Sequence, residues 1–180
     1  MSILKVARMG HPVLRQKCEP IDPKQITGPE VQHLIRDMFE TMAEYNGIGL
    51  AAPQVHRPIR MAIAGGEVDD EGRPQFRILI NPEITVLDAD SRSGMYEGCL
   101  SLPGLTGWVE RPDRIRVKAY DHTGKQVEFE LEGYPAIVTQ HECDHLDGVL
   151  YVDNATGLYT LNLVRASDDP AFGWNIDTVP

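Results

Sequence analysis

The fold is organised by one segment, which reads PAIVTQHECDHL at residues 135–146. Pro135 opens and Gly148 closes a predicted helix, and the segment 141–145 is an H-E-x-x-H pattern. Two histidines four residues apart, His141 and His145, lie on one helical face with convergent imidazoles, and Glu142 projects beside them. The segment therefore predicts a helix that carries two ligands of a metal site.

Short β-strands are predicted around this helix. Apolar and β-branched runs at 61–64, 76–80 and 84–87 stand between Gly, Pro, Asn and Asp residues, as strands do. The intervening segment 65–74 carries four acidic residues and is expected to be an exposed loop.

The clearest hairpin joins residues 114–120 to 126–131. Apolar residues alternate with three cations in the first strand, and with Glu128, Glu130 and the following Glu132 in the second, so the charged sets face each other on the outer side. The predicted register pairs Lys118 with Glu128 and Arg116 with Glu130.

The N-terminal third contributes one strong helix. It begins near Pro29, a favoured first helical residue, and Asn46-Gly47 ends it. A shorter helical segment is expected at 11–16. The combined pattern predicts an α+β fold, in which short antiparallel strands pack around an inner helix carrying H-E-x-x-H. The apolar positions of the first helix follow a 3.6-residue period and are Val31, Leu34, Ile35, Met38 and Met42.

Composition limits the class of protein. The chain has 180 residues, with 17 Lys plus Arg against 27 Asp plus Glu, a net charge of −10 that argues against direct nucleic-acid or anionic-membrane binding. We expect one domain over residues 1–180, with no apolar run of the ~20 residues that cross a bilayer. The N-terminus lacks the pattern of a signal peptide, and three cysteines fit reduced thiols, so a cytoplasmic protein is expected.

Two histidines do not complete a catalytic metal site, which needs three protein ligands and one open position. No histidine follows His145, so the third ligand is expected upstream. Cys99, in the segment EGCLS at 97–101, is the candidate, whereas Cys18 and Cys143 are interpreted as small buried packing residues. A thiolate with two imidazoles suits zinc, iron, nickel or cobalt, and ligand chemistry does not choose among them.

Three segments carry a family resemblance: GIGLAAPQ at 47–54, EGCLS at 97–101 and QHECDHLDG at 140–148. In order and spacing they resemble the signature motifs of peptide deformylases, and the match spans about residues 8–153. The tail at 154–180 departs from the charged C-terminal helix that often ends the common bacterial form. The resemblance implies a metal-dependent hydrolase that removes the formyl group, as formate, from the N-terminal N-formyl-methionine of newly made polypeptides.

The resemblance also implies roles for the site residues. Cys99, His141 and His145 would bind Fe²⁺, for which Zn²⁺, Ni²⁺ or Co²⁺ can substitute, and water would take the fourth position. Glu142 would move the proton of that water to the leaving amine. The hydrogen-bond donors to the developing oxyanion would be the Gln54 side-chain amide and the Leu100 backbone N–H.

The substrate-binding residues follow from the same motifs. Ile48 and Gly49 are expected to hold the substrate backbone in an extended pairing, and Ile137 and Val138 to line an apolar pocket for the methionine side chain. Glu97 is expected to be structural and to pair with Arg111. Because such a substrate emerges from a ribosome, any contact there should be transient and local.

Two other functions use parts of this pattern. A metallopeptidase shares H-E-x-x-H, but Cys99 replaces its usual third ligand and the two further motifs are foreign to it. A closed structural metal site would need a fourth protein ligand, and Asp144, the nearest one, points off the face of the two histidines. Comparing the hydrolysis of a formyl-methionyl peptide with that of an internal peptide bond distinguishes a deformylase from a metallopeptidase.

Overall fold

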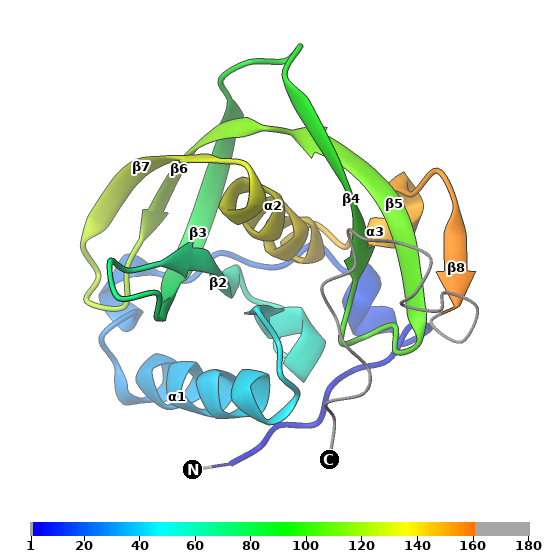
Figure 1. Cartoon of the computed structure of the whole chain (residues 1–180). Coiled ribbons are helices and arrows are strands. Elements are labelled where there is room, and N and C mark those ends of the chain that lie inside the picture. The colour runs from blue at the N-terminus through cyan, green and yellow to red at the C-terminus, as the bar shows by residue number, and fades with distance from the viewer. Residues whose placement is uncertain (1, 161–180) are drawn as a thin grey trace.

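Two antiparallel sheets enclose one inner helix in the computed structural model, which describes residues 2–160 (Figure 1). The larger sheet has the order β1-β2-β3-β6-β7 and the smaller one the order β4-β5-β8. The predicted α+β class is confirmed, and α2, the inner helix, spans Tyr134–Leu146. The strands are β1 (Gly49–Ala51), β2 (Met61–Val68), β3 (Pro74–Val86), β4 (Arg92–Gly98), β5 (Leu105–Pro112), β6 (Arg114–Tyr120), β7 (Gln126–Glu132) and β8 (Leu158–Thr160).

Helix α2 is buried on nearly all sides, since nine of its 13 residues are buried. It therefore lacks the broad solvent face of an amphipathic helix, and both sheets pack against it. Gly148, with φ of +75°, follows its C-terminus, and a Cβ there would lie 2.7 Å from the backbone of Arg15. Glycine is thus required by both conformation and space, and it fixes the end of α2 against the N-terminal segment.

The first helix, α1 (Pro29–Glu44), covers the β1–β2 end of the larger sheet (Figure 1). All five apolar positions of its predicted face are buried, so that prediction is confirmed. Short 3₁₀ turns, η1 (Pro12–Arg15), η2 (Pro23–Gln25) and η3 (Ala52–Val55), connect the elements, and α3 (Tyr151–Asn154) follows α2. No helix among residues 2–160 is long and apolar enough to span a membrane.

The hairpin β6–β7 has the predicted register. Arg116 lies opposite Glu130 and Lys118 opposite Glu128, and both pairs are ion pairs on the outer face. The inward residues of β6 pack with Val138 of α2 in one apolar cluster. The alternation of charged and apolar residues therefore sets this register as expected.

Two predictions for the middle of the chain are wrong. The strands expected at 76–80 and 84–87 are one strand, β3, with an irregularity between Ile80 and Glu83. Asn81 adopts a φ of +52° there, and its side chain makes two 2.8 Å hydrogen bonds to the backbone of Ile21, so the chain bends without leaving the sheet. The loop expected at 65–74 is shorter, because residues 65–68 continue β2, and Glu67 and Val68 pair with β3.

Strands β1, β4, β5 and β8 were not predicted. Strand β4 reads RSGMYEG, with few β-branched residues, and it is held by its neighbour β5. A Cβ on Gly94 would lie 2.4 Å from the Trp108 ring, so glycine leaves space for this ring across the strand. In the tail, β8 ends at Thr160, and the rest of the segment 154–180 lies outside the described residues.

Candidate metal centre and active site

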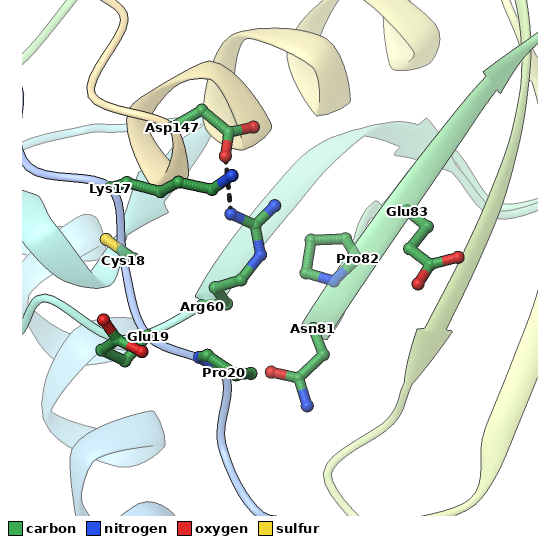
Figure 2. A pocket seen from close by; sticks show the side chains of 9 residues that line it. All are labelled: Lys17, Cys18, Glu19, Pro20, Arg60, Asn81, Pro82, Glu83 and Asp147. Carbon is green, nitrogen blue, oxygen red and sulfur yellow. Dashed lines mark hydrogen bonds and ion pairs between the residues drawn. The ribbon is translucent and has the colours of Figure 1, made fainter.

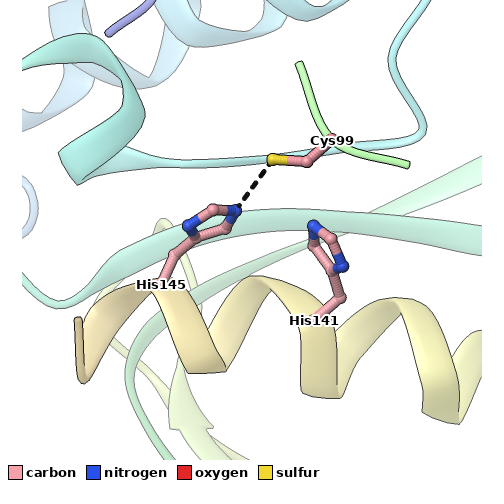
Figure 3. A group of neighbouring side chains, drawn as sticks. All are labelled: Cys99, His141 and His145. Carbon is pink, nitrogen blue, oxygen red and sulfur yellow. Dashed lines mark hydrogen bonds between the residues drawn. The ribbon is translucent and has the colours of Figure 1, made fainter. Parts of the chain in front are cut away.

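Three potential metal ligands converge between α2 and the end of β4 (Figure 3). His141 and His145 project from α2, one turn apart, and Cys99 follows the last residue of β4. Their ligand atoms all lie within 4.8 Å of one another, and Cys99 Sγ is 3.3 Å from His145 Nε2. The structure therefore joins two residues of one helix to a cysteine more than 40 positions upstream.

The donor set fits a divalent metal. Ligand atoms around a four-coordinate ion lie about 3.3–3.8 Å apart, given metal–ligand distances of about 2.0–2.3 Å. The Sγ–Nε2 separation is in this range, and His145, 1% exposed, has no hydrogen-bond partner for its Nδ1 among residues 2–160. No fourth side chain joins the group within residues 2–160, which leaves room for water or substrate and disfavours a closed structural site.

A buried chain of charges orients His141. Its Nδ1 lies 2.8 Å from Oε2 of Glu97, which leaves Nε2 for a metal. Arg111 donates to both oxygens of Glu97, at 2.6 and 3.0 Å, and to Asp144 at 2.8 Å. The predicted Glu97–Arg111 pair is confirmed, and the contact of Glu97 with His141 is an addition that no local pattern could indicate.

These contacts also shift pKa values. Burial alone would raise the pKa of Glu97, but hydrogen bonds from His141 and Arg111 lower it below its ordinary value. Burial holds the pKa of His145 well below its ordinary value. Glu97 therefore stays ionised opposite His141, and His145 stays neutral, as a metal ligand requires.

Glu142 lies beside the ligands on α2 and is 4% exposed. Burial raises its pKa to about 7, and its Oε2 has no hydrogen-bond partner in the described part of the chain. Its Oε1 passes so close to β1 that a Cβ on Gly49 would lie 2.3 Å away. Glycine at position 49 therefore makes space for this carboxylate.

Gln54 and Leu100 lie on the other side of Cys99. Gln54 is 2% exposed; its Oε1 accepts from the Ala51 N–H at 2.8 Å, and its Nε2 lies 3.3 Å from Cys99 Sγ. The Leu100 N–H donates to no acceptor among the described residues. The side-chain amide of Gln54 and the backbone N–H of Leu100 therefore both lie near the cysteine ligand.

The four residues expected to bind substrate lie in two places, at the β1 edge of the larger sheet and in α2. Ile48 is 44% exposed and Gly49 is buried beside Glu142, so both lie at the free edge of the larger sheet. Ile137 is buried in the first half of α2. Val138 packs with β2, β3 and β6 residues in the core.

Two further side chains, which the sequence did not single out, belong to this region. Ser101 is fully buried, and its Oγ lies 3.3 Å from Nε2 of Gln54. Tyr151 of α3 stacks on the ring of His141, with centroids 6.0 Å apart and planes inclined by 21°. The sequence signal for Tyr151 is an aromatic residue shortly after Gly148. Whether it stacks on His141 depends on the turn between α2 and α3, which the sequence does not show.

A surface pocket lies away from these residues, at the C-terminal end of α2 (Figure 2). It encloses about 450 Å³, and Arg60 crosses it to pair with Asp147 at 2.7 Å. It contains none of the three converging ligands, and its lining mixes cations with carboxylates.

Comparisons with known proteins identify one family. The model of the polypeptide deformylase family matches residues 3–160. A peptide deformylase of Leptospira biflexa is 44% identical over 98% of this chain and 95% of its own. The solved peptide deformylase of Thermotoga maritima is 39% identical with a TM-score of 0.77, covering 87% of this chain and 100% of its own. A Met-Ala-Ser-bound class I type b peptide deformylase from Acinetobacter baumannii is 34% identical with a TM-score of 0.78, covering 86% of this chain and 99% of its own.

The fold and the comparisons define a metal-dependent amidohydrolase. The chain belongs to the peptide deformylase family, whose members remove the N-formyl group from nascent peptides. Its reaction is the hydrolysis of the formyl amide of an N-terminal formyl-methionine, which releases formate.

Proposed function

We propose that deformylation takes place at Cys99, His141 and His145, and that these residues hold a single Fe²⁺ ion. The observation that carries this assignment is the convergence of the three ligand atoms beside the buried Glu142. A divalent metal at this site supplies Lewis acidity, which polarises the formyl carbonyl and lowers the pKa of water. Zn²⁺, Ni²⁺ and Co²⁺ suit the same donors and can substitute.

Glu142 moves the proton of the reaction. Water adds to the formyl carbon while Glu142 takes its proton, and the carboxyl then gives that proton to the amine nitrogen as the C–N bond breaks. Burial beside the ligands raises the pKa of Glu142 and so favours a carboxyl that holds the proton between these two steps. The products are formate and a peptide with a free amino terminus.

Gln54 and Leu100 stabilise the carbonyl oxygen as it gains negative charge. The Gln54 Nε2 and the Leu100 N–H both lie beside Cys99, and the latter has no acceptor in the described part of the chain. Such donors typically contribute about 10²–10³-fold each to the rate.

The substrate backbone pairs with the free edge of β1. The carbonyl of Ile48 accepts from the N–H of Gly65 in β2 at 2.8 Å, so strand alternation directs the peptide groups of Gly49 to the open edge. Ile137 and Val138 contribute the apolar wall for the methionine side chain. The Acinetobacter relative with bound Met-Ala-Ser supports a peptide that begins with methionine.

The protein acts in the cytoplasm, where its substrates emerge from ribosomes. The net charge of −10 opposes a broad grip on ribosomal RNA, so contact with the ribosome is transient and local. The same charge opposes binding to anionic membranes and free nucleic acid.

Formate release and metal content, measured on the same sample, test the proposal. Formyl-Met-Ala-Ser should be hydrolysed and an internal peptide bond left intact. Glu142→Gln should keep the metal and lose about 10²–10⁴-fold in kcat. Cys99→Ala should lose the metal, whereas the matched variant Cys143→Ala should keep it.

Three results would reject parts of this proposal. Near-normal turnover by Glu142→Gln would remove the proton role, and unchanged metal in Cys99→Ala would place the third ligand elsewhere. Thiolate and Fe²⁺ are both oxidisable, so aerobic activity should decay faster with iron than with nickel or zinc. Equal lifetimes would contradict the expected oxidative lability of the iron-loaded enzyme.

A further inference from the structure

The N-terminal segment 7–9 connects the two loops that carry the proposed oxyanion donors. The N–H of Ala7 donates to the carbonyl of Gln54 at 2.7 Å, and the N–H of Met9 donates to the carbonyl of Ser101 at 2.8 Å. Gln54 and Ser101 are 47 positions apart in the chain. Segment 7–9 thus fixes the distance between two loops that come from different sheets.

Arg8 lies between these two backbone bonds and makes a third. Its guanidinium Nη1 donates to the carbonyl oxygen of Leu100. The peptide plane before it is held as well, because the Cys99 carbonyl accepts from the N–H of Leu102 at 2.9 Å. The three successive carbonyls of residues 99–101 therefore each have a donor, and residues 8 and 9 supply two of the three.

This arrangement constrains the Leu100 N–H. The N–H lies in the same peptide plane as the Cys99 carbonyl, and the next plane contains the carbonyl that Arg8 holds. With both planes fixed, the N–H cannot rotate away from Cys99 unless one of these bonds breaks. Preorganised donors are effective because they need no reorganisation during the reaction.

The Arg8 side chain makes no other hydrogen bond among residues 2–160. It is exposed and forms no ion pair with a carboxylate of residues 2–160. An exposed hydrogen bond of this kind adds little to the stability of a fold. Its removal should therefore affect the Leu100 segment without unfolding the protein.

We propose that Arg8 is a positioning residue for deformylation, which holds the Leu100 carbonyl so that the Leu100 N–H stays directed at the substrate carbonyl oxygen. The inference rests on the proposed function, because it requires the Leu100 N–H to be an oxyanion donor.

Steady-state kinetics of Arg8→Met test it. The substitution removes donor and charge but keeps an unbranched side chain. We expect kcat for formate release to fall about tenfold, a part of the 10²–10³-fold that a lost donor would give. KM should change by less than about twofold, because the lost interaction acts in the transition state. Arg8→Lys, which keeps a cationic donor, should recover much of kcat.

The matched control is Arg36→Met, on the exposed face of α1, where the arginine side chain makes no hydrogen bond within the described residues. It should leave kcat, KM, Tm and metal content unchanged. Hydrogen exchange at the Leu102 amide, which donates to the Cys99 carbonyl at 2.9 Å, gives a readout apart from activity: it should accelerate in Arg8→Met and stay unchanged in Arg36→Met.

Several outcomes would overturn the inference. A raised KM with unchanged kcat would make Arg8 a substrate contact, and lowered Tm or metal content would make it structural. Wild-type kinetics in Arg8→Met would reject the positioning role and leave the proposed function intact. A metal-loaded wild type without formate release would remove both.

Discussion

Two sets of arginine–glutamate pairs in this protein have the same chemistry and opposite surroundings. Arg111 and Glu97 pair behind His141 with side chains only 6% and 4% exposed. Arg116 and Glu130 pair on the outer face of β6–β7 with side chains 41% and 48% exposed. Glu97 of the first pair is hydrogen-bonded to His141, a proposed metal ligand, whereas the second pair is exposed to solvent.

The difference shows what each pair does. A buried ion pair gains little over apolar packing but becomes costly when one partner is removed, so it holds its members in one geometry. An exposed pair is weak and screened, and many such pairs together favour one strand register. The buried pair thus orients His141, and the exposed ladder aligns a hairpin.

The largest effect is expected from Arg111→Leu. Glu97 would remain buried without its cation, so the free energy of unfolding of the metal-loaded protein should fall by about 3–5 kcal/mol. Urea unfolding measures this change. Arg111→Lys keeps the charge but loses the two-pronged geometry and should recover part of the loss. A loss below about 1 kcal/mol would show that water reaches Glu97.

Glu97→Gln should affect the metal more than the fold. Glutamine still offers one oxygen to Arg111, but it no longer presents a carboxylate to His141. Metal affinity, measured by chelator competition, should fall about 10–100-fold. The control is Glu110→Gln, an exposed glutamate on the same strand as Arg111, which should keep wild-type affinity. Equal affinities in the two variants would contradict the orienting role.

On the exposed ladder, Arg116→Gln should lower the free energy of unfolding by about 0.2–1 kcal/mol. Because the pairs are exposed, the difference from wild type should shrink between 0.05 and 0.5 M salt, as the Debye length falls to a few ångströms. A salt-independent loss as large as that of Arg111→Leu would erase the contrast between the two pairs.

The smallest effect concerns the turn of the same hairpin. Asp121 accepts hydrogen bonds from the Thr123 hydroxyl at 2.6 Å and the Lys125 N–H at 3.0 Å, and the Thr123 contact above all lowers its pKa. A lowered folded-state pKa gives stability above the unfolded value of about 3.9, and this stability is lost as pH falls through the folded value. Asp121→Asn should therefore differ from wild type at pH 6 and converge with it near pH 2. Carboxyl NMR titration measures the pKa directly, and a value at or above 3.9 would contradict the prediction.

Local patterns predicted the parts of the protein where neighbours in sequence are neighbours in space. The spacing of His141 and His145 follows from one helical turn, and the register of Arg116 with Glu130 follows from alternation in a short hairpin. The acidic segment at 65–74 and the break within β3 were misjudged because distant partners decide them. Glycines and prolines there mark bends that the sheet accommodates.

The sequence by itself determined the inner helix, its two histidines, the three motifs and the family, because each depends on residue types at short, fixed spacings. Only the tertiary structure decided that Cys99 meets His145, that Glu97 orients His141, and that Arg8 holds the Leu100 carbonyl. These contacts join residues about 45 to 90 positions apart. Chain folding brings such residues together, and no local periodicity records which distant partner each one meets.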